Sequence, residues 1–443
     1  MDKLKLKVII GIAVIVIVIG GGIMYGVFFA KKDYRGTLNM WVVFGSSADY
    51  KDVIDAFEKL HKGVKVNIIS KNPNTYEQEL VESLASGAGP DIMMIHNSWL
   101  PKYKSILTSL SPIISTKYSF GLREYQSNLV DVATQDFVDS EQIYALPLAV
   151  DTMQLYWNRD LFNTAGITYP PRTWDEVVQY VARLTIKDDK NNITQSAISL
   201  GSADNINRAP DILSLLMLQT GAQMVDDKKT RATFQSSVKK NGQNYNPAET
   251  ALSFYTSFAD PASPNYSWNN GMNYSINVFT QGRLAMMLNY AYNFNKIKND
   301  NPRLNFSVTS IPQTFDASKN ITFANYWAYG VANSSVNSEA AWDFLIFFSG
   351  LGNGGDPSHL SNYLKKTFQF PARRDLVNDF RKDPLSGVFA EGALQATDWY
   401  RVDPNEIETI FLNMIRQVVS GQQPANKAVQ QASAQVTSLM RKK

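Results

Sequence analysis

Side chains able to do covalent chemistry are few in this chain and lie far apart. It has no cysteine and only three histidines, His61, His96 and His359, and no two of these have the spacing of metal ligands on one helix. A Ser-His-Asp triad would need one of the three, and only His96, at the end of an expected strand, is well placed. Such a histidine more commonly makes a local hydrogen bond. We therefore expect no catalytic residue, no metal and no cofactor.

Sequence motifs and carboxylates point the same way. The chain has no phosphate-binding loop, nucleophile elbow, H-E-x-x-H motif or dinucleotide-binding fingerprint after its first strand. A pair of carboxylates for glycoside hydrolysis would use residues such as Asp91, Asp151 and Asp398. Aspartates of this kind more often cap helices or bind ligand hydroxyls. A hydrolase is therefore the less favoured interpretation.

Aromatic and amide side chains collect instead at strand ends and in loops. Most of the 8 Trp and 21 Tyr residues are expected to fill the core. Those beside expected strands are Phe44, Trp99, Tyr156, Tyr290, Tyr292, Trp327, Tyr329 and Trp399. Sugar rings offer apolar C–H faces to aromatic rings and hydroxyl rims to Asn, Asp, Ser and Arg. These residues favour a binding site for a small polar ligand.

The elements that must position these residues alternate between strand and helix. Expected strands span 38–44, 64–69 and 91–95, with amphipathic helices at 48–62 and 76–85 between them. Thr173 and Glu176 form a capping box that opens a helix to Leu184. Further segments are a helix at 210–219, strands at 284–288, 307–311 and 327–332, a helix at 339–348, and a helical tail at 404–440 interrupted near 421–424. This alternation predicts an α/β fold with doubly wound sheets.

The N-terminal segment predicts a membrane anchor. No charged residue occurs from Val8 to Ala30, a run of 23 residues that is long enough to cross a bilayer as a helix. Phe28 stands where a signal-peptide cleavage site prefers a small residue. Lysines flank both ends almost equally, and the short lysine-bearing N-terminus is the easier side to leave inside. We therefore expect an uncleaved single-pass helix in the cell membrane and an extracytoplasmic body. The formal net charge of +3 argues against nucleic-acid binding.

One long ordered stretch carries a family resemblance. It starts with the sequence IYALPLAVDT at 143–152, continues with LYWNRDLF at 155–162 and ends with PRTWDE at 171–176. Shorter supporting pieces are GPDI at 89–92, FTQGRLAMM at 279–287, YWAYGV at 326–331 and FPARRD at 370–375. From about Thr37 to Leu439 the chain resembles the extracellular solute-binding family of ABC importers. The similar branch contains the maltodextrin- and multiple-sugar-binding proteins.

The resemblance implies a type II periplasmic-binding-protein-like fold with two α/β lobes joined by hinge strands. The implied hinge crossings lie near Ala149–Thr152 and Ile311–Thr322. Residues 1–36 would form the anchor and linker, 37–150 plus 313–350 the first lobe, and 151–312 plus 351–443 the second. The lipid-anchoring cysteine of many tethered relatives is missing here, so the expected protein anchor would replace it.

Ligand-binding residues are implied by the same resemblance, at strand ends that face the cleft between the lobes. They are Gly45, Ser46, Ser47, Asn97, Ser98, Asp151, Thr152, Asn289, Tyr290, Tyr292, Trp327, Arg373 and Trp399. Together with Phe44, Tyr156 and Tyr329 from the aromatic set, they make up the predicted site. No residue of this set is assigned a catalytic or metal-binding role.

The expected function is capture of a sugar or oligosaccharide by hinge closure, followed by delivery to ABC permease subunits. The protein is expected to act as a monomer. A binding protein for glycerol phosphate, a polyamine or a peptide is an alternative, but one Asp and one Arg in the predicted site suit a neutral polyol better. Two further candidate functions are those of a surface-anchored enzyme acting on glycans and of a module that reports ligand to a membrane sensor.

Overall fold

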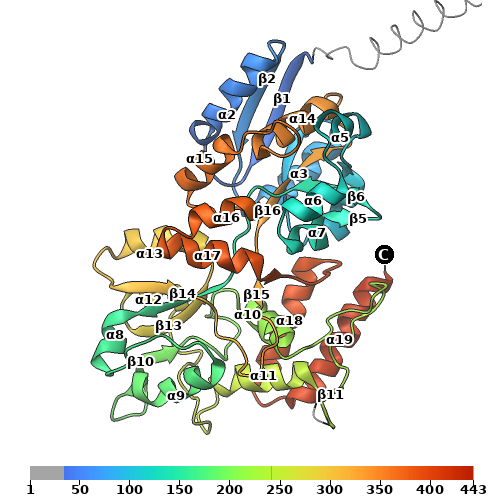
Figure 1. The fold of residues 1–443 in the computed structure, drawn as a ribbon. Coiled ribbons are helices and arrows are strands. Elements are labelled where there is room, and N and C mark those ends of the chain that lie inside the picture. The colour runs from blue at the N-terminus through green and yellow to red at the C-terminus, as the bar shows by residue number, and fades with distance from the viewer. Residues whose placement is uncertain (1–33, 241, 443) are drawn as a thin grey trace, which may run out of the picture.

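The computed structural model describes residues 34–240 and 242–442. It contains two lobes, one above the other in Figure 1, and each lobe is built on its own mixed β-sheet. Within the described residues, no helix has the length and apolar character needed to cross a lipid bilayer. The expected membrane helix at Val8–Ala30 lies outside the described residues.

The sheet of the first lobe has the strand order β2-β1-β3-β16-β4, with β7 paired to β16. Its strands are β1 (Gly36–Val42), β2 (Val64–Ser70), β3 (Ile92–His96), β4 (Leu107–Thr108), β7 (Ala145–Leu146) and β16 (Trp327–Ala332). Strands β1, β2 and β3 are parallel, and α2 (Ser47–Leu60) and α3 (Tyr76–Ala85) connect them. Strand β16 returns from late in the chain and runs antiparallel to β3.

The turn between β1 and α2 is held by the start of the helix. The backbone N–H of Ser46 donates to the Asp49 carboxylate at 2.8 Å, as in a capping box. Tyr50, Val53 and Phe57 then recur at helical spacing and are buried against the lobe. The turn that precedes α2 is thereby fixed at the carboxyl end of β1.

The sheet of the second lobe has the order β14-β8-β13-β10-β9. Its strands are β8 (Gln154–Asn158), β9 (Ile186–Lys187), β10 (Ile193–Ile198), β13 (Leu284–Asn289) and β14 (Phe306–Thr309). Strand β10 is parallel to β13, whereas β8 runs antiparallel to both β13 and β14. Thr173 is confirmed as the N-cap of α9 (Trp174–Leu184), because its hydroxyl accepts from the Glu176 N–H at 3.2 Å. The Glu176 carboxylate accepts from the Arg172 N–H at 2.5 Å instead of from Thr173, so the reciprocal half of the predicted capping box is wrong.

Three stretches carry the chain between the lobes, and short pairings tie them together. Ala149 bridges to Pro371, and Thr152 bridges to Ala324. Strand β15 (Thr322–Phe323) pairs with β17 (Ala396–Thr397), and β15 lies at the junction of the lobes in Figure 1. Ala149 and Thr152 bound one of the segments where hinge crossings were expected, and Thr322 ends the other; the hinge itself stays a prediction.

Helices from the last third of the chain divide between the lobes. Helices α14 (Ser338–Ser349) and α15 (Ser358–Thr367) contact α2, whereas α18 (Pro404–Val419) and α19 (Ala425–Arg441) contact α11 (Pro247–Ser257). The expected division assigned 351–443 to the second lobe. Helix α15 lies instead against the first lobe, where the Tyr363 and Tyr50 hydroxyls are 3.1 Å apart and Leu360 and Leu364 are buried.

The remaining elements are short and lie around the two sheets. The helices are α4 (Leu100–Tyr103), α5 (Pro112–Tyr118), α6 (Leu122–Asn128), α7 (Asp131–Phe137), α8 (Arg159–Thr164), α10 (Ala209–Gln219), α12 (Ser275–Thr280), α13 (Phe294–Asp300), α16 (Arg374–Phe380) and α17 (Pro384–Leu394). The strands are β5 (Val138–Asp139), β6 (Gln142–Ile143), β11 (Val238–Lys240) and β12 (Gln243–Tyr245).

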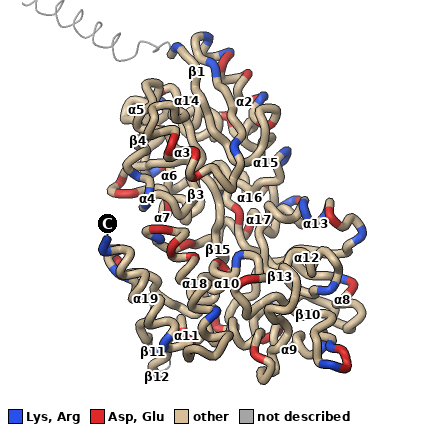
Figure 2. The backbone as a smooth tube through the Cα atoms, turned by 180° about the vertical axis from the view of Figure 1, so that it is seen from behind, with Lys and Arg blue, Asp and Glu red and all other residues tan. Residues whose placement is uncertain are grey.

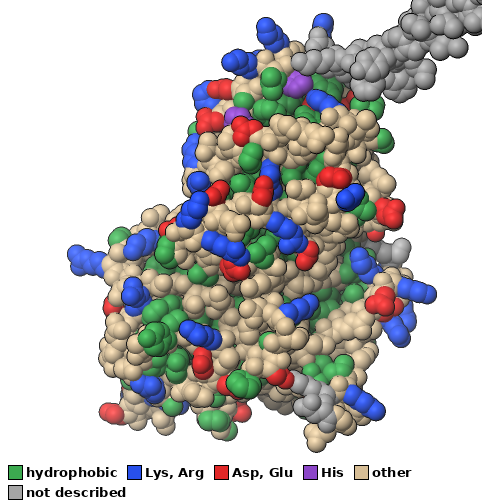
Figure 3. Space-filling model, in the orientation of Figure 1, with side chains coloured by type: hydrophobic (Ala, Val, Ile, Leu, Met, Phe, Trp, Pro, Cys, Tyr) green, Lys and Arg blue, Asp and Glu red, His purple; other side chains and the backbone are tan. Residues whose placement is uncertain are grey.

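Charged side chains of both signs are distributed over both lobes. Figure 2 shows Lys and Arg interspersed with Asp and Glu along the backbone seen from behind. Figure 3 shows the opposite face, where basic and acidic groups alternate with small hydrophobic areas. This mixed surface matches the small net charge of the sequence.

Gly201 lies just beyond the carboxyl end of β10, on the junction side of the second lobe, where the backbone packs closely against Ala259. Its φ is +107°, and a Cβ there would lie 2.6 Å from the Ala259 nitrogen. We expect Gly201→Ala to lower the free energy of unfolding by about 3 kcal/mol, because backbone strain and a steric clash add. Gly421, with φ +70° and open space around a Cβ, is the matched control. Gly421→Ala should cost about 1 kcal/mol, and equal losses in urea unfolding would contradict the expected clash.

Candidate functional site

The carboxyl ends of strands from the two sheets face each other across the junction of the lobes. Phe44 and Gly45 follow β1 in the first lobe, and Tyr290 to Tyr292 follow β13 in the second. Ligands of α/β proteins bind at such carboxyl ends, where the loops between strands and helices supply polar groups. Two cavities lie at this junction, and each is lined by residues of both lobes.

The first cavity, which we call the aromatic cavity, has a volume of about 340 Å³. It is lined by Phe44, Gly45 and Trp327 from the first lobe, by Tyr292 and Asn295 from the second, and by Asp151, Asn325 and 366–370. Its size falls in the range of small-molecule sites, roughly 300–1000 Å³. Both lobes and the crossing stretches between them therefore contribute to one cavity.

Aromatic rings stand on both sides of the aromatic cavity. Phe44 is 38% exposed and meets Trp327 edge-on, with ring centroids 6.1 Å apart. On the opposite side Tyr292 is 50% exposed and stacks on the buried Tyr290 at 5.9 Å. Phe44 and Tyr292 are therefore large rings left partly open to solvent, one on each lobe. They could pack on the apolar faces of a ligand.

Asp151 lies in the floor of the aromatic cavity and holds the second-lobe loop in place. Its two carboxylate oxygens accept the backbone N–H groups of Ala291 at 2.9 Å and Tyr292 at 3.1 Å. Burial raises the pKa of Asp151 to about 7, although these backbone hydrogen bonds favour the ionised form. Each oxygen keeps a further lone pair for a ligand hydroxyl.

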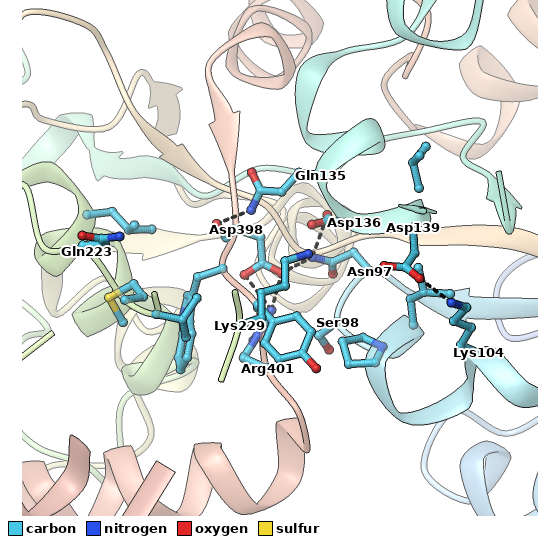
Figure 4. Close-up of a pocket in the computed structure, with 18 of the residues that line it drawn as sticks. Asn97, Ser98, Lys104, Gln135, Asp136, Asp139, Gln223, Lys229, Asp398 and Arg401 are labelled. Atoms are coloured by element: carbon cyan, nitrogen blue, oxygen red, sulfur yellow. Dashed lines mark hydrogen bonds and ion pairs between the residues drawn. The ribbon is translucent and has the colours of Figure 1, made fainter. Parts of the chain in front are cut away.

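The second cavity, which we call the charged cavity, has a volume of about 470 Å³ and appears in Figure 4. Asn97 donates from its amide to Asp398 at 2.6 Å and to Asp136 at 3.3 Å. Arg401 forms an ion pair with Asp398 at 2.6 Å. Lys104 and Lys229 also line the cavity, on its first-lobe and second-lobe sides respectively.

Two of the carboxylates that line the charged cavity, Asp136 and Asp398, are buried and both accept from the Asn97 amide. Burial raises the pKa of Asp136 well above its usual range, and the neighbouring Asp398 carboxylate adds to this rise. Burial also raises the pKa of Asp398, and Arg401 opposes that rise. Arg401 supplies the positive charge that stabilises the Asp398 carboxylate in this buried group.

Tyr326 connects the two cavities, which share no lining residue. It lines the aromatic cavity, and its hydroxyl donates to Asp136 in the charged cavity at 2.8 Å. Among the described residues, no group of three or more His, Cys, Asp or Glu side chains is arranged to hold a metal ion.

Most predicted site residues lie at the lobe junction. Those lining the aromatic cavity are Phe44, Gly45, Asp151, Tyr292, Trp327 and Tyr329. Those lining the charged cavity are Asn97, Ser98 and Trp399. Ser46 and Ser47 begin α2 directly after Gly45, and the buried Asn289 and Tyr290 support Tyr292 from behind. Thr152 is buried in a crossing stretch, where its hydroxyl accepts from Gln154 at 3.0 Å.

Seven of the sixteen predicted residues line neither cavity, and two of these, Tyr156 and Arg373, make contacts that serve the fold. Tyr156 points into the core of the second lobe, where it is fully buried and its hydroxyl donates to the Tyr290 carbonyl at 2.8 Å. Arg373 donates to the carbonyls of Ser349 and Gly350 at the end of α14, both at 2.7 Å. A guanidinium at a helix C-terminus satisfies carbonyls that lack partners. The side chains of Tyr156 and Arg373 thus have structural roles in this molecule.

Sequence reasoning missed a polar group beside the aromatic cavity. Asp211, in the apolar helix α10, is buried and pairs with Arg208 through two hydrogen bonds of 2.8 and 2.9 Å. Burial alone would raise the pKa of Asp211, but Arg208 holds it below its usual range. A carboxylate in an apolar helix, with an arginine three residues before it, is the signal that could have identified this pair.

Comparison with known proteins agrees with this architecture. Residues 44–353 match the family model for bacterial extracellular solute-binding proteins. The galactooligosaccharide-binding protein of Bacillus subtilis (strain 168) is 23% identical over 409 residues, which is 91% of this chain and 90% of that protein. Two solved structures with the same fold are the sugar-binding protein MalE of Xanthomonas citri and the cyclic alpha-maltosyl-1,6-maltose binding protein of Arthrobacter globiformis.

The first of these structures has a TM-score of 0.74 at 18% identity and covers 92% of this chain and 98% of its own. The second has a TM-score of 0.74 at 16% identity and covers 93% of this chain and all of its own. The two-lobed α/β fold is therefore shared, and the family match spans both lobes. The chain belongs to the bacterial extracellular solute-binding protein family.

Proposed function

We propose that this protein captures a sugar or oligosaccharide outside the cytoplasm and delivers it to an ABC importer. The observation that carries this proposal is the aromatic cavity, where exposed rings from both lobes stand beside hydrogen-bonding groups. Phe44 and Trp327 would pack on one side of a sugar and Tyr292 on the other. Asp151 and the Asn295 amide would bind hydroxyls. The names of the relatives, a galactooligosaccharide-binding protein among them, support the same ligand class.

Capture by hinge closure follows from where these groups lie. Phe44 and Trp327 belong to the first lobe and Tyr292 to the second, so a ligand touching all three favours the state with the lobes closest together. The crossing stretches between the lobes provide the hinge. We propose that the closed form is the one that ABC permease subunits recognise.

The charge of the aromatic cavity supports a neutral ligand. Asp49, Asp151 and Lys366 are the ionisable carboxylate and amine groups of its lining, and Lys366 already pairs with Asp49 at 3.3 Å. A polyamine would require several unpaired carboxylates, and a phosphate several unpaired cations. Neither condition is met in this lining.

Membrane tethering is a separate part of the proposal and rests on the sequence alone. The uncharged run Val8–Ala30 would cross the bilayer once and leave the two lobes on the extracytoplasmic side. The expected lobe division, with α15 moved to the first lobe and the hinge in the crossing stretches, belongs to the same proposal.

Replacing Tyr292 tests the aromatic contact with the ligand. We expect Tyr292→Ala to weaken sugar binding about 10- to 100-fold, since a lost ring contact is worth about 1.4–2.8 kcal/mol at a central site. Tyr169→Ala is the control, because Tyr169 is a second-lobe tyrosine that is 69% exposed and lines neither cavity. Isothermal titration with maltotriose, galactooligosaccharides and cyclic glucans measures the effect. Flat traces of the unaltered protein for every sugar would overturn the sugar proposal.

Asp151 should make the affinity depend on pH. Its pKa is about 7 in the free protein, and a ligand hydroxyl that donates to the carboxylate binds the ionised form. Affinity is therefore expected to rise between pH 5 and pH 8 and then to level off. Asp151→Asn should weaken binding and flatten this rise. An affinity that is constant with pH in both proteins would contradict a direct hydroxyl contact at Asp151.

Fractionation tests the proposed anchor. The full chain should stay with membranes after alkaline carbonate washing, whereas a chain that begins at residue 34 should be released to the supernatant. Release of both would rule out a membrane-spanning tether.

A further inference from the structure

A chain of four polar side chains crosses the junction between the lobes beside the aromatic cavity. Ser98 and His96 belong to the first lobe, Asn325 to a crossing stretch and Asp211 to α10 of the second lobe. The Ser98 hydroxyl is 2.8 Å from His96 Nδ1, and His96 Nε2 is 3.1 Å from Asn325 Oδ1. Asn325 Nδ2 lies 3.4 Å from Asp211 Oδ2. In this row of four side chains, Asn325 is therefore the residue that is hydrogen-bonded to both lobes.

Hydrogen-bond chemistry fixes the direction of every link. Asp211 is ionised and can only accept, so Asn325 must offer its amide nitrogen there and its oxygen to His96. His96 Nε2 must then carry a proton and donate. The backbone N–H of Ser98 points at His96 Nδ1 from 3.3 Å, so Nδ1 must accept. The chain thus selects one tautomer of His96.

The charged groups around the ring agree with a neutral histidine. Burial lowers the pKa of His96 to about 3, and the positive charge of Arg401 adds to this effect. Arg208 lowers the pKa further, while Asp211 and the hydrogen bond with Asn325 raise it. His96 is therefore uncharged across the physiological pH range.

Backbone hydrogen bonds at and beside Asn325 hold its position relative to the first crossing stretch. Its N–H donates to the Asp151 carbonyl at 3.0 Å, and the adjacent Ala324 bridges to Thr152. On the far side, Asp211 also accepts from the Tyr290 hydroxyl at 2.8 Å, and Tyr290 supports Tyr292 by stacking. The 3.4 Å link to Asp211 is the longest in the chain and the one that spans the lobes.

We propose that Asn325 is a positioning residue that couples the ligand-facing ends of the two lobes. Its carboxamide holds His96 in the Nε2–H tautomer on the first lobe. It also holds the Asp211 carboxylate on the second lobe, and through it Arg208 and Tyr290. Only a side chain that accepts on one side and donates on the other meets both demands. This role deepens the proposed function and rests on it, but its first test needs no ligand.

Nitrogen NMR of the histidines tests the tautomer directly, because the chain contains only three of them. The unaltered protein should show His96 protonated at Nε2 alone, with no titration from pH 5 to pH 8. In Asn325→Asp a carboxylate faces His96 Nε2 on one side and Asp211 on the other, and an imidazolium at His96 becomes favourable beside the two negative charges. His96 should then titrate within that range. An Nδ1–H tautomer in the unaltered protein, or an unchanged His96 in Asn325→Asp, would overturn the proposal.

A double variant separates positioning from damage to the fold. Asn325→Asp combined with Asp211→Asn exchanges the amide and the carboxylate and keeps the net charge. Asn325→Asp alone should weaken maltotriose binding about 10- to 100-fold, the range for a hydrogen bond to a charged group. The double variant should recover to within about 5-fold of the unaltered protein. A double variant as weak as, or weaker than, the single one would overturn the coupling.

The control variant is Asn299→Asp, an exposed position on α13 that lines neither cavity. It should leave both the His96 signal and the affinity unchanged, and a similar loss there would overturn a specific role for Asn325. If the unaltered protein binds no sugar at all, the proposed function fails, whereas the tautomer experiment still decides the role of Asn325.

Discussion

The arrangement of the two lobes depends on the hydrogen bonds that Asp151 accepts. Its carboxylate accepts the N–H groups of Ala291 and Tyr292, and its carbonyl accepts the Asn325 N–H. One residue of the first crossing stretch therefore fixes both a second-lobe loop and another crossing stretch. The aromatic cavity forms around this point. Any movement of the lobes must pivot about these bonds or break them, which ties hinge geometry to the binding surface.

The sequence allowed much of the fold to be predicted, because its signals were local. Helix α9 begins at its capping residue Thr173 as expected, and the C-terminal helix pair stops and restarts around 420–424. Lobe membership after residue 350 was harder to predict. Helix α15 packs on the first lobe through contacts with α2, a helix about 300 residues earlier, and neither helix carries a local mark of that pairing.

Site residues were predictable where they lie at strand ends. They were less predictable where the direction of the side chain decides whether a residue reaches the cavity or the core. Tyr292 and Trp327 follow or begin strands and reach the aromatic cavity. Tyr156 lies on β8 of the second-lobe sheet, but its side chain is buried in the core of that lobe. Asn325 and Asp211 were overlooked because each is an ordinary polar residue in sequence. The partners of the Asn325 side chain, His96 and Asp211, are both more than a hundred positions away, so no local pattern marks it.

Strand β16 also has a consequence for how the molecule folds. It sits between β3 and β4 in the first sheet, and its residue Trp327 pairs with His96 of β3, 231 positions earlier in the chain (327 − 96). During synthesis the first lobe has to wait for its inner strand until the whole second-lobe sheet has been made. Such non-local pairing slows folding. The first-lobe sheet of a nascent chain would therefore remain incomplete until about three-quarters of the chain has emerged from the ribosome.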